Sequence, residues 1–408
     1  MFCRIDKHPR LIFAALVLLE IFCWIEVDLY APAFPQIRRF FGTSEEMIQW
    51  TLSLNFLGYF ISSLFVGPLA DSLGRRPVLL GGSLLFVLGS LLCVLAPSLD
   101  LLLVGRLVQG AGVSAPTILA VAVIADLYQG DRQIKLFSLI NSLITITMAA
   151  APVLGAWLSE SFGWRANFIT ILAGSGLATV AVFLILPESH PPERRSAFSL
   201  KQLAQNYRTL LGSGFFLATA FGIVLLCTPY FVFISIIPFL FMETLGLPMA
   251  QYVYYQGAVV GLFALGSLAV PLLIGRVDPG RMTVSSVSLC LGAALLLCLQ
   301  ALFRVDAAMP ITALMCLFVV GLVWPCGVLF AMVFAAFPEL KGSASALFSA
   351  LRMMVMAGAI SLSGHFYDDS FRPVGTIIFL LALLGAPLLL YARHRGVVPA
   401  DSGITPVH

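Results

Sequence analysis

Long apolar stretches recur from one end of the chain to the other, and they limit its possible folds more than any other feature. A stretch of about 18 or more mostly apolar residues is long enough to cross a bilayer as a helix. Hydrophobic residues make up 60% of the 408 residues and charged residues 11%, and this charged fraction is about half of the usual value for soluble proteins. The sequence therefore predicts an all-α membrane protein. We expect twelve transmembrane helices, at residues 11–31, 48–70, 78–96, 101–125, 136–159, 166–187, 215–242, 251–275, 282–303, 308–336, 343–366 and 373–393.

The longest polar interval, 188–212, separates these spans into two groups of six. We expect an N-terminal six-helix bundle over residues 1–187 and a C-terminal six-helix bundle over residues 213–408. The interval between them contains an amphipathic segment, Ser199–Leu211, which we expect to lie on the membrane surface as a helix. Two six-span halves are typical of transporters whose substrate site lies between the halves, near the middle of the membrane.

Positively charged residues are distributed unequally between the loops. If the N-terminus is inside, 16 of the 23 Lys and Arg residues lie in inner loops and termini, five lie in outer loops, and two, Arg106 and Arg352, lie within spans. Short loops rich in Lys and Arg remain in the cytoplasm. We therefore expect a multi-pass protein of a bacterial inner (cytoplasmic) membrane with both termini cytoplasmic. The first apolar run, 11–31, is too long and too acidic for a cleavable signal peptide.

The chain lacks the sequence patterns of a catalytic or metal site. Its eight cysteines show no Cys-x-x-Cys spacing, and most lie in expected spans, where reduced thiols pack as small apolar side chains. It contains no nucleotide-binding loop and no nucleophile–base pair on a loop. We expect no metal, no cofactor, no enzymatic activity and no nucleic-acid partner. The expected partners are a small-molecule substrate, protons and the lipid bilayer, and the expected state is a monomer.

A charged turn, Gly67–Pro77, lies between the second and third spans. Its sequence, Gly-Pro-Leu-Ala-Asp-Ser-Leu-Gly-Arg-Arg-Pro, resembles the signature loop of the major facilitator superfamily. The resemblance implies the twelve-helix major facilitator fold and a loop that acts as a conformational latch. A partial copy of the loop, Gly275–Arg281, occurs in the second half. The latch residues implied are Gly67, Asp71, Gly74, Arg75, Arg76 and, at the end of span four, Asp126 as a partner for Arg75.

Further motifs resemble the drug:proton antiporter type of this superfamily. Leu103–Gly110 looks like the fourth-span motif of proton-coupled members. Ala151–Trp157 resembles the fifth-span antiporter motif through Pro152 and Gly155, with Ala151 where glycine is usual. The segments that resemble the Bcr/CflA multidrug-resistance branch, or the turn into span six of the superfamily, are Pro191–Arg195, Pro238-Phe239, Phe337–Ala346 and Gly163–Phe168.

Three acids, Glu20, Glu26 and Asp28, lie within the first span. Charged groups are costly in hydrocarbon, so acids inside a span are usually functional. Glu20 and Asp28 are separated by about 80° around the helix and about 12 Å along it, whereas Glu26 lies about 160° from Asp28. Burial favours the neutral form of a carboxyl group, and an entering cation favours the ionised form. All three acids are therefore candidates for proton coupling, and the alternative is that hydrogen bonds or Arg106 neutralise them.

The surroundings of these acids strengthen the resemblance. Some multidrug transporters carry two first-helix acids eight residues apart, as Glu20 and Asp28 are. The run Asp28–Pro35 fits the Asp-x-Tyr-x-Pro-x-x-Pro context of the Bcr/CflA branch. By the same resemblance, Arg106 is expected to take part in proton coupling, and a purely structural tie is the alternative.

Aromatic and polar residues within the spans are candidates for the wall of a substrate pocket, because such pockets combine apolar lining with a few polar anchors. Arg352 is included because it could bind an anionic group of a substrate, and the alternative is that its charged end extends toward the edge of the membrane. The expected substrate-binding residues are Trp24, Tyr30, Asn55, Tyr59, Asn141, Thr145, Tyr230, Phe233, Tyr254, Gln256, Trp324 and Arg352, with Phe231 and Tyr255 as neighbours.

These observations predict a proton-coupled antiporter that exports small amphipathic or cationic compounds by alternating access. One alternative is a dedicated transporter of a single metabolite, such as an amino acid, peptide, polyamine or siderophore, in either direction. Another is a membrane receptor or scaffold that transports nothing. Simultaneous neutralisation of Glu20 and Asp28 distinguishes a transporter from a receptor or scaffold, since it has no consequence for a protein that transports nothing.

Overall fold

The computed structural model describes residues 9–128, 130–195, 197–273, 276–325, 337 and 340–395, and these residues contain helices and no strand. Gly275, Pro338 and Glu339, which belong to two of the motifs above, lie outside the described residues. The helices of the N-terminal half are α1 (Pro9–Tyr30), α2 (Phe34–Phe41), α3 (Glu45–Leu73), α4 (Arg75–Leu95), α5 (Leu99–Leu127), α6 (Gly130–Phe162) and α7 (Arg165–Ile185). The later helices are α8 (Leu200–Leu211), α9 (Gly214–Pro238), α10 (Met249–Leu273), α11 (Pro279–Leu302), α12 (Ala308–Trp324), α14 (Lys341–His365) and α15 (Arg372–Arg395).

Twelve of these helices correspond to the twelve expected spans. Ten of the described helices are long and apolar enough to cross a membrane. α1 and α12 complete the set: every 18-residue stretch of α1 holds three charged residues, and α12 is described over 17 residues only. The largest difference among the helix starts is at α6, which begins at Gly130 rather than at residue 136. Because helices continue into the polar headgroup layer, loss of hydropathy does not mark their ends.

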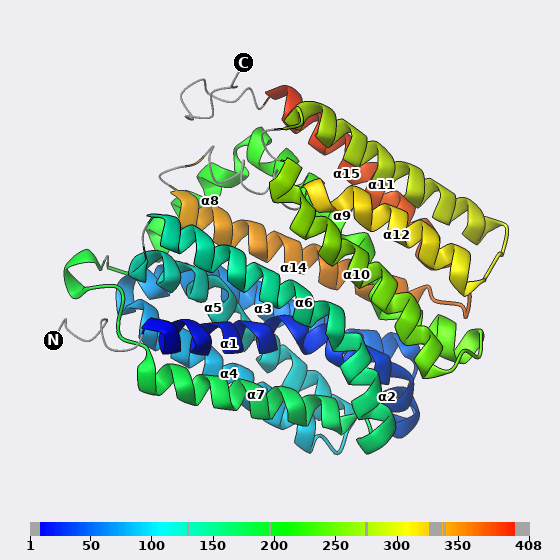
Figure 1. The fold of residues 1–408 in the computed structure, drawn as a ribbon, viewed down its shortest axis with the longest axis horizontal. Coiled ribbons are helices and arrows are strands. Elements are labelled where there is room, and N and C mark those ends of the chain that lie inside the picture. Colours follow the sequence, from blue (N-terminus) through cyan, green and yellow to red (C-terminus); the bar gives the residue numbers. More distant parts are fainter. Residues whose placement is uncertain are drawn as a thin grey trace.

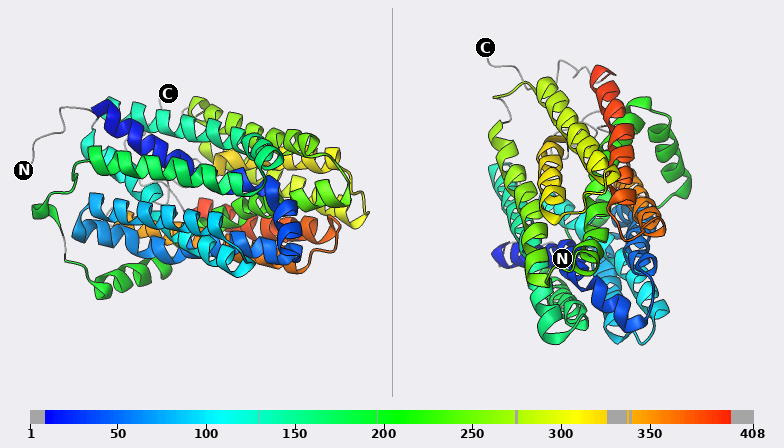
Figure 2. Two further views of the ribbon diagram at one scale, coloured as in Figure 1. Left: turned by 90° about the horizontal axis from the view of Figure 1, so that it is seen from below. Right: turned by 90° about the vertical axis from the view of Figure 1, so that its right-hand side faces the viewer.

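The long helices lie side by side along one axis of the molecule, as expected for helices that cross a membrane together (Figures 1 and 2). α8 lies at one end of this axis and α2 at the other, and we name the two ends of the molecule after them. α1 begins and α15 finishes at the α8 end (Figure 1). The short helix α8 begins one residue after the expected Ser199, whose hydroxyl accepts a hydrogen bond from the Gln202 amide at 3.2 Å.

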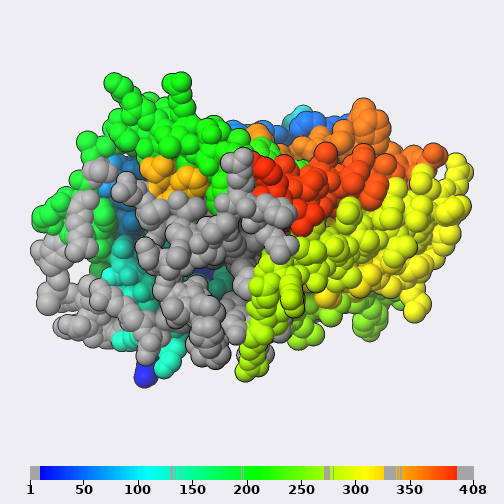
Figure 3. Space-filling model, turned by 90° about the horizontal axis from the view of Figure 1, so that it is seen from above, coloured from blue at the N-terminus to red at the C-terminus, as the bar shows by residue number. Residues whose placement is uncertain are grey.

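Helices pack extensively within each half of the chain. α1 packs against α6 and α7, and α5 packs against α3 and α4. In the C-terminal half, α9 packs against α15, and α11 packs against α12 and α15. Figure 3 shows α11 and α15 side by side on one face of the molecule. The halves meet where α3 packs against α14 and α6 against α10, so residues on these helices and on α1 can face the opposite half.

Prolines determine how α1 ends. Pro32 and Pro35 have no amide hydrogen to donate, and each is favoured in the first turn of a new helix. The chain accordingly passes from α1 through one short 3-10 turn, Ala31–Ala33, into α2. This break places Arg38 of α2 at the boundary between the halves, where it contacts Glu243.

Candidate functional site

All three acids of α1 are buried: the exposed fraction of the residue is 2% for Glu20, 3% for Glu26 and 4% for Asp28. Their burial follows from the position of α1, which packs against α5, α6 and α7. The three carboxylates nevertheless have different surroundings, because they point in different directions around the helix.

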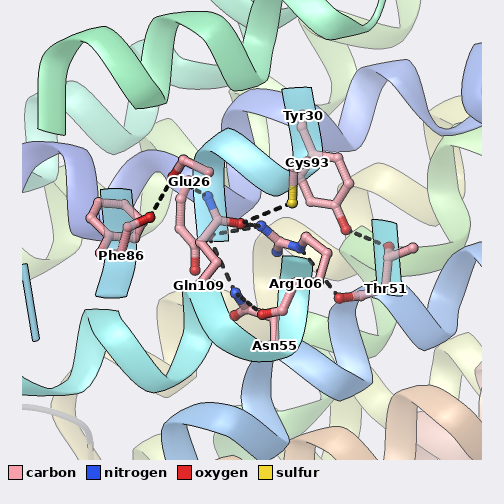
Figure 4. A network of polar contacts seen from close by, with 9 residues as sticks. Glu26, Tyr30, Thr51, Asn55, Phe86, Cys93, Arg106 and Gln109 are labelled. Atoms are coloured by element: carbon pink, nitrogen blue, oxygen red, sulfur yellow. Dashed lines mark hydrogen bonds and ion pairs between the residues drawn. The ribbon is translucent and has the colours of Figure 1, made fainter. Parts of the chain in front are cut away.

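Glu26 is held by Arg106 in a network within the N-terminal half (Figure 4). Its Oε2 accepts from Arg106 Nη1 at 2.8 Å and from Asn55 Nδ2 at 3.3 Å. Arg106 also donates to Gln109 and, through Nε, to the Thr51 carbonyl at 3.3 Å. Further hydrogen bonds stabilise a buried ion pair, and this network joins α1, α3 and α5, although Arg106 Nη2 is buried without a partner among the described residues.

Aromatic and polar neighbours complete the network. The Arg106 guanidinium lies 4.4 Å from the centre of the Tyr30 ring, a cation–π contact. The Tyr30 hydroxyl pairs with Thr51 Oγ1 at 2.6 Å. Gln109 stands one helical turn after Arg106, and its Nε2 donates to Ser90 Oγ of α4 at 2.9 Å. Tyr30 and Asn55, which are predicted to line a substrate pocket, therefore take part in the Arg106 network.

Glu20 and Asp28 each keep a carboxylate oxygen without a hydrogen-bond partner in the described part of the chain. Glu20 Oε2 accepts from Trp24 Nε1 at 2.7 Å, while Oε1 is buried and unpaired. Asp28 Oδ1 is likewise buried and unpaired. Of the three acids, Glu26 is thus the one neutralised by Arg106, and Glu20 and Asp28 are the ones with free capacity to bind a proton or cation.

Asp28 faces the C-terminal half. Tyr230 of α9 and Tyr252 of α10 lie close enough to Asp28 to interact with it electrostatically. The Tyr252 hydroxyl donates to Gln256 Oε1, and both the Tyr230 hydroxyl and Gln256 Nε2 are buried without a partner among the described residues. Side chains from α1, α9 and α10 therefore converge on one polar cluster at the boundary between the halves.

Tyr252 is a residue that the sequence analysis missed. Its signal was present, because Tyr252 and Gln256 are four residues apart and so lie on one face of a helix. Tyr254, which was expected at the site, points away from the cluster and is 76% exposed on the outside of the molecule.

Near Glu20 a second group of side chains meets from both halves. Tyr59 of α3 interacts electrostatically with Arg352 of α14 and with Glu20. The Tyr59 hydroxyl pairs with Thr117 Oγ1 at 2.9 Å, and Arg352 Nε is buried with no hydrogen-bond partner in the described ranges.

The remaining expected substrate residues are dispersed. Phe233 is buried in α9, and Trp324 donates to Thr283 Oγ1 of α11 at 3.3 Å, so it serves packing within the C-terminal half. Asn141 is exposed and Thr145 half-buried on α6. Phe231 contacts Phe56 of the opposite half, with ring centres 5.8 Å apart.

The signature loop is held by ion pairs and by Glu188. Arg75 Nη1 lies 2.9 Å from Asp71 Oδ1, and Arg75 Nε lies 3.6 Å from Asp126 Oδ2. The backbone amides of Arg75 and Arg76 donate to Glu188 at 2.9 and 3.3 Å. Glu188 was not expected from the sequence, although its place just after α7 brings it to the same end as the loop.

Gly74 permits this arrangement. Its φ is +108°, a conformation that L side chains rarely adopt, and a Cβ atom there would collide with the Glu188 carboxylate. Arg76 donates from Nη2 to the Phe183 carbonyl at 2.7 Å. Gly67, by contrast, has open space around its Cα, so close packing does not account for a glycine there.

The expected antiporter motif lies beside Asp28. A Cβ atom on Gly155 of α6 would overlap the Leu29 carbonyl oxygen of α1, so the two backbones approach closely one residue from Asp28. Pro152 lies one turn earlier inside α6. Glycine at such a contact allows membrane helices to pack at short distance.

Polar contacts between the halves occur at the α2 end. Arg38 Nη1 lies 2.5 Å from Glu243 Oε2 and 2.7 Å from Glu45 Oε1. His365 Nδ1 lies 3.2 Å from Glu46 Oε1, and Ser363 Oγ donates to Gln49 Oε1 at 3.1 Å. These contacts hold the two halves together at this end.

The charge of Arg38 is stabilised by its partners. Burial lowers the pKa of Arg38, and the hydrogen bond and charge of Glu243, with the charge of Glu45, outweigh that effect, so its pKa lies above the ordinary value. Within the described residues, no three His, Cys, Asp or Glu side chains gather in a way that could hold a metal ion.

Twelve membrane helices in two halves, with acids near their boundary that keep an unpaired oxygen within the described structure, define a secondary-transporter architecture. The chain belongs to the Major Facilitator Superfamily, whose family model matches residues 16–360. The superfamily and the twelve-helix fold expected from the sequence are thereby confirmed.

Curated relatives are similar over most of the chain. The multidrug resistance protein MdtL of Shewanella oneidensis is 28% identical, over 89% of this chain and 91% of that protein. MdtL of Citrobacter koseri is 30% identical, over 67% of this chain and 69% of that protein. The uncharacterized MFS-type transporter YdgK of Bacillus subtilis is 26% identical, over 89% of this chain and 90% of that protein.

Solved structures agree in fold. A partially occluded inward-open structure of the xylose transporter XylE from E. coli has a TM-score of 0.73 at 13% identity and covers 98% of this chain and 100% of its own. The human organic anion transporter MFSD10 has a TM-score of 0.68 at 17% identity and covers 94% of this chain and 100% of its own. At these identities the likeness concerns the fold alone.

Proposed function

We propose that the protein is a proton-coupled antiporter that exports small amphipathic or cationic compounds across the cytoplasmic membrane of a bacterium. The observation that carries this proposal is the difference among the acids of α1. Glu20 and Asp28 each have a buried, unpaired carboxylate oxygen within the described structure, whereas Glu26 is bound by Arg106. The multidrug resistance proteins among the relatives support the same class of substrate.

A proton and a cationic compound compete for Asp28, and this competition couples export of the compound to proton uptake. A buried carboxylate without a partner is costly, so in the empty site Asp28 binds a proton. A cationic compound that enters beside Asp28 stabilises the ionised form, and the proton leaves. A proton arriving from the other side later displaces the compound. Tyr230 and Gln256, each with an unpaired polar atom within the described part, supply hydrogen bonds to the bound compound.

Glu26 and Arg106 act as a positioning pair. Because the pair joins α1, α3 and α5, it holds α1 at a fixed rotation while Asp28 and Glu20 change protonation state. Proton coupling therefore depends on Arg106 through the orientation of α1.

Alternating access follows from movement of the two six-helix bundles, 1–187 and 213–408, about the acids. We assign the α8 end to the cytoplasm, since Lys and Arg are concentrated there. Because Arg38 and Glu243 join the halves at the α2 end, the protein in this structure is closed toward the outside. The signature loop, held by Arg75, Asp71 and Asp126, is the latch of the opposite state, and the protein acts as a monomer.

Proton release from the purified protein in weakly buffered detergent tests the proposal. Dansylcadaverine and tetraphenylphosphonium should each release protons from the wild type, and Asp28→Asn should abolish the release. Glu160→Gln is the matched control, because Glu160 is an exposed acid at the end of α6. Absence of release with every lipophilic cation, or undiminished release in Asp28→Asn, would refute proton-coupled exchange at Asp28.

A further inference from the structure

We propose that Glu20 of α1 and Arg352 of α14 form the two ends of a binding site for amphipathic zwitterions. Such compounds carry an amine and a carboxylate on one apolar body. This inference rests on the export function proposed above and names a substrate class for it. The inference is based on two oppositely charged side chains, one from each half, that both interact with Tyr59. Each of them has a buried atom without a hydrogen-bond partner among the described residues.

Glu20 offers one oriented oxygen. The bond from Trp24 Nε1 to Oε2, 2.7 Å long, fixes the carboxylate and leaves Oε1 unpaired among the described residues. Glu20 is 2% exposed, so a group that binds Oε1 is shielded from water. A protonated amine satisfies both the charge and the hydrogen-bonding capacity of this oxygen.

Arg352 offers the complementary group. It lies on α14 between apolar residues, and Met353 and Met356 beside it are buried. Its Nε is buried without a hydrogen-bond partner in the part of the chain that the structure describes. A guanidinium is charged at any physiological pH, and it binds carboxylates through two parallel hydrogen bonds. A guanidinium that keeps an unpaired, buried nitrogen inside a membrane protein has capacity for an anionic partner.

Tyr59 connects the two charges. It interacts electrostatically with both Glu20 and Arg352, and its bond to Thr117 Oγ1 at 2.9 Å fixes its hydroxyl. The contact between α3 and α14 is also fixed nearby, because Ser53 Oγ donates to the Ala357 carbonyl at 3.0 Å. Glu20 of one half and Arg352 of the other thus both lie within electrostatic reach of Tyr59.

A zwitterion completes this site better than a simple cation does. Glu20 and Arg352 form no ion pair with each other in the described structure, so each keeps an atom that can pair with a ligand. The amine of a zwitterion pairs with Glu20 and its carboxylate with Arg352, whereas a cation satisfies Glu20 alone. Because the ligand then contacts both halves, its binding is sensitive to their relative position.

Three dansyl probes of equal chain length test the inference on the full-length protein. N-ε-dansyl-lysine is the zwitterion, dansylcadaverine lacks its carboxylate, and N-dansyl-6-aminohexanoate lacks its amine. We expect dansyl-lysine to bind the wild type about tenfold more tightly than either single-charge probe, the size of one charge-assisted contact. Equal affinity for dansyl-lysine and dansylcadaverine would refute the inference without use of any variant.

Two variants assign the charges. Arg352→Gln should weaken binding of dansyl-lysine about tenfold and leave dansylcadaverine unchanged, while Glu20→Gln should weaken both amines and spare dansyl-aminohexanoate. Arg372→Gln, at an exposed arginine of α15, is the matched control. An Arg352→Gln variant that weakens all three probes equally would show a structural role and contradict the assignment. Proton release by dansylcadaverine without preference for the zwitterion would overturn this inference alone, whereas failure of every cation to release protons would overturn the export function.

Discussion

At the scale of single residues, removing either Glu26 or Arg106 should destabilise the fold because it leaves the other side chain buried without its partner. Arg106→Gln leaves Glu26 buried without its cation, and breaking one side of a buried pair costs about 3–5 kcal/mol. We expect this variant to lower the apparent melting temperature strongly. Adding Glu26→Gln should restore much of the loss, because a buried neutral amide is cheaper than a buried unpaired charge.

Thermal melting of the four proteins of this double-mutant cycle, in one detergent, measures the coupling. Arg165→Gln is a suitable comparison, since Arg165 also donates to backbone carbonyls, those of Val94 and Ala96, but pairs with no acid in the described structure. Additive losses from Glu26→Gln and Arg106→Gln would contradict the account of the pair.

At the scale of elements, the close contact of α6 with α1 should tolerate no side chain at Gly155. A Cβ atom there would overlap the Leu29 carbonyl oxygen, and overpacking of this kind typically costs about 1–3 kcal/mol. Gly155→Val should displace α1 beside Asp28 and reduce substrate-driven proton release at least severalfold. Gly176→Val is the control, because Gly176 of α7 has open space around it. Equal loss in both variants would mean that helix propensity, and not the contact, matters.

The docking of α8 makes a separate prediction about pH. The Tyr207 hydroxyl donates to the Leu64 carbonyl at 2.7 Å, and burial raises the pKa of Tyr207 from 10.0 to about 12. Because the folded pKa is raised, the contribution of this bond to stability is complete below about pH 10 and is lost as the pH rises toward 12. The melting temperatures of wild type and Tyr207→Phe should therefore differ at neutral pH and converge at about pH 12. A difference that stays constant over this range would contradict the assignment.

At the scale of the whole molecule, the ion pair between Arg38 and Glu243 should favour the arrangement closed at the α2 end. Arg38→Glu places three acids together with Glu45 and Glu243, and like charges in contact repel. We expect the halves to separate at this end. Spin labels at residues 39 and 250, both exposed, should report a longer distance on a background free of native cysteines.

Charge reversal on both sides provides the control. Glu243→Arg combined with Arg38→Glu restores an attractive pair across the halves and should return the distance distribution toward that of the wild type. An unchanged distribution in Arg38→Glu alone would mean that apolar contacts such as that between Phe34 and Phe239, with ring centres 5.9 Å apart, hold this end closed.

Much of the fold could be predicted from the sequence because each membrane helix satisfies its own backbone hydrogen bonds. Length and hydropathy are then sufficient to place most spans, and ten of the described helices meet both criteria. The signature loop was recognisable for a related reason: its glycines and charges follow one another closely in the chain. The three acids of α1 were found on the same local basis, since charges are rare in spans.

The tertiary structure decided which of those acids is paired. Glu26 and Arg106 are 80 residues apart, and the rotation of α1 against α5 that joins them depends on packing along both helices. Helical geometry placed Glu26 opposite Asp28, but it could not say that this face meets Arg106. Tyr252 and Glu188 were missed because their partners lie on distant segments.

The sequence by itself determined the class of protein, the number of membrane helices and the presence of three acids in the first helix, since these depend on composition and short-range pattern. Only the tertiary structure separated Glu26, neutralised by Arg106, from Glu20 and Asp28, which keep unpaired oxygens within the described residues. The physical reason is that the state of a buried charge depends on the groups around it in space, and packing between helices decides which groups those are.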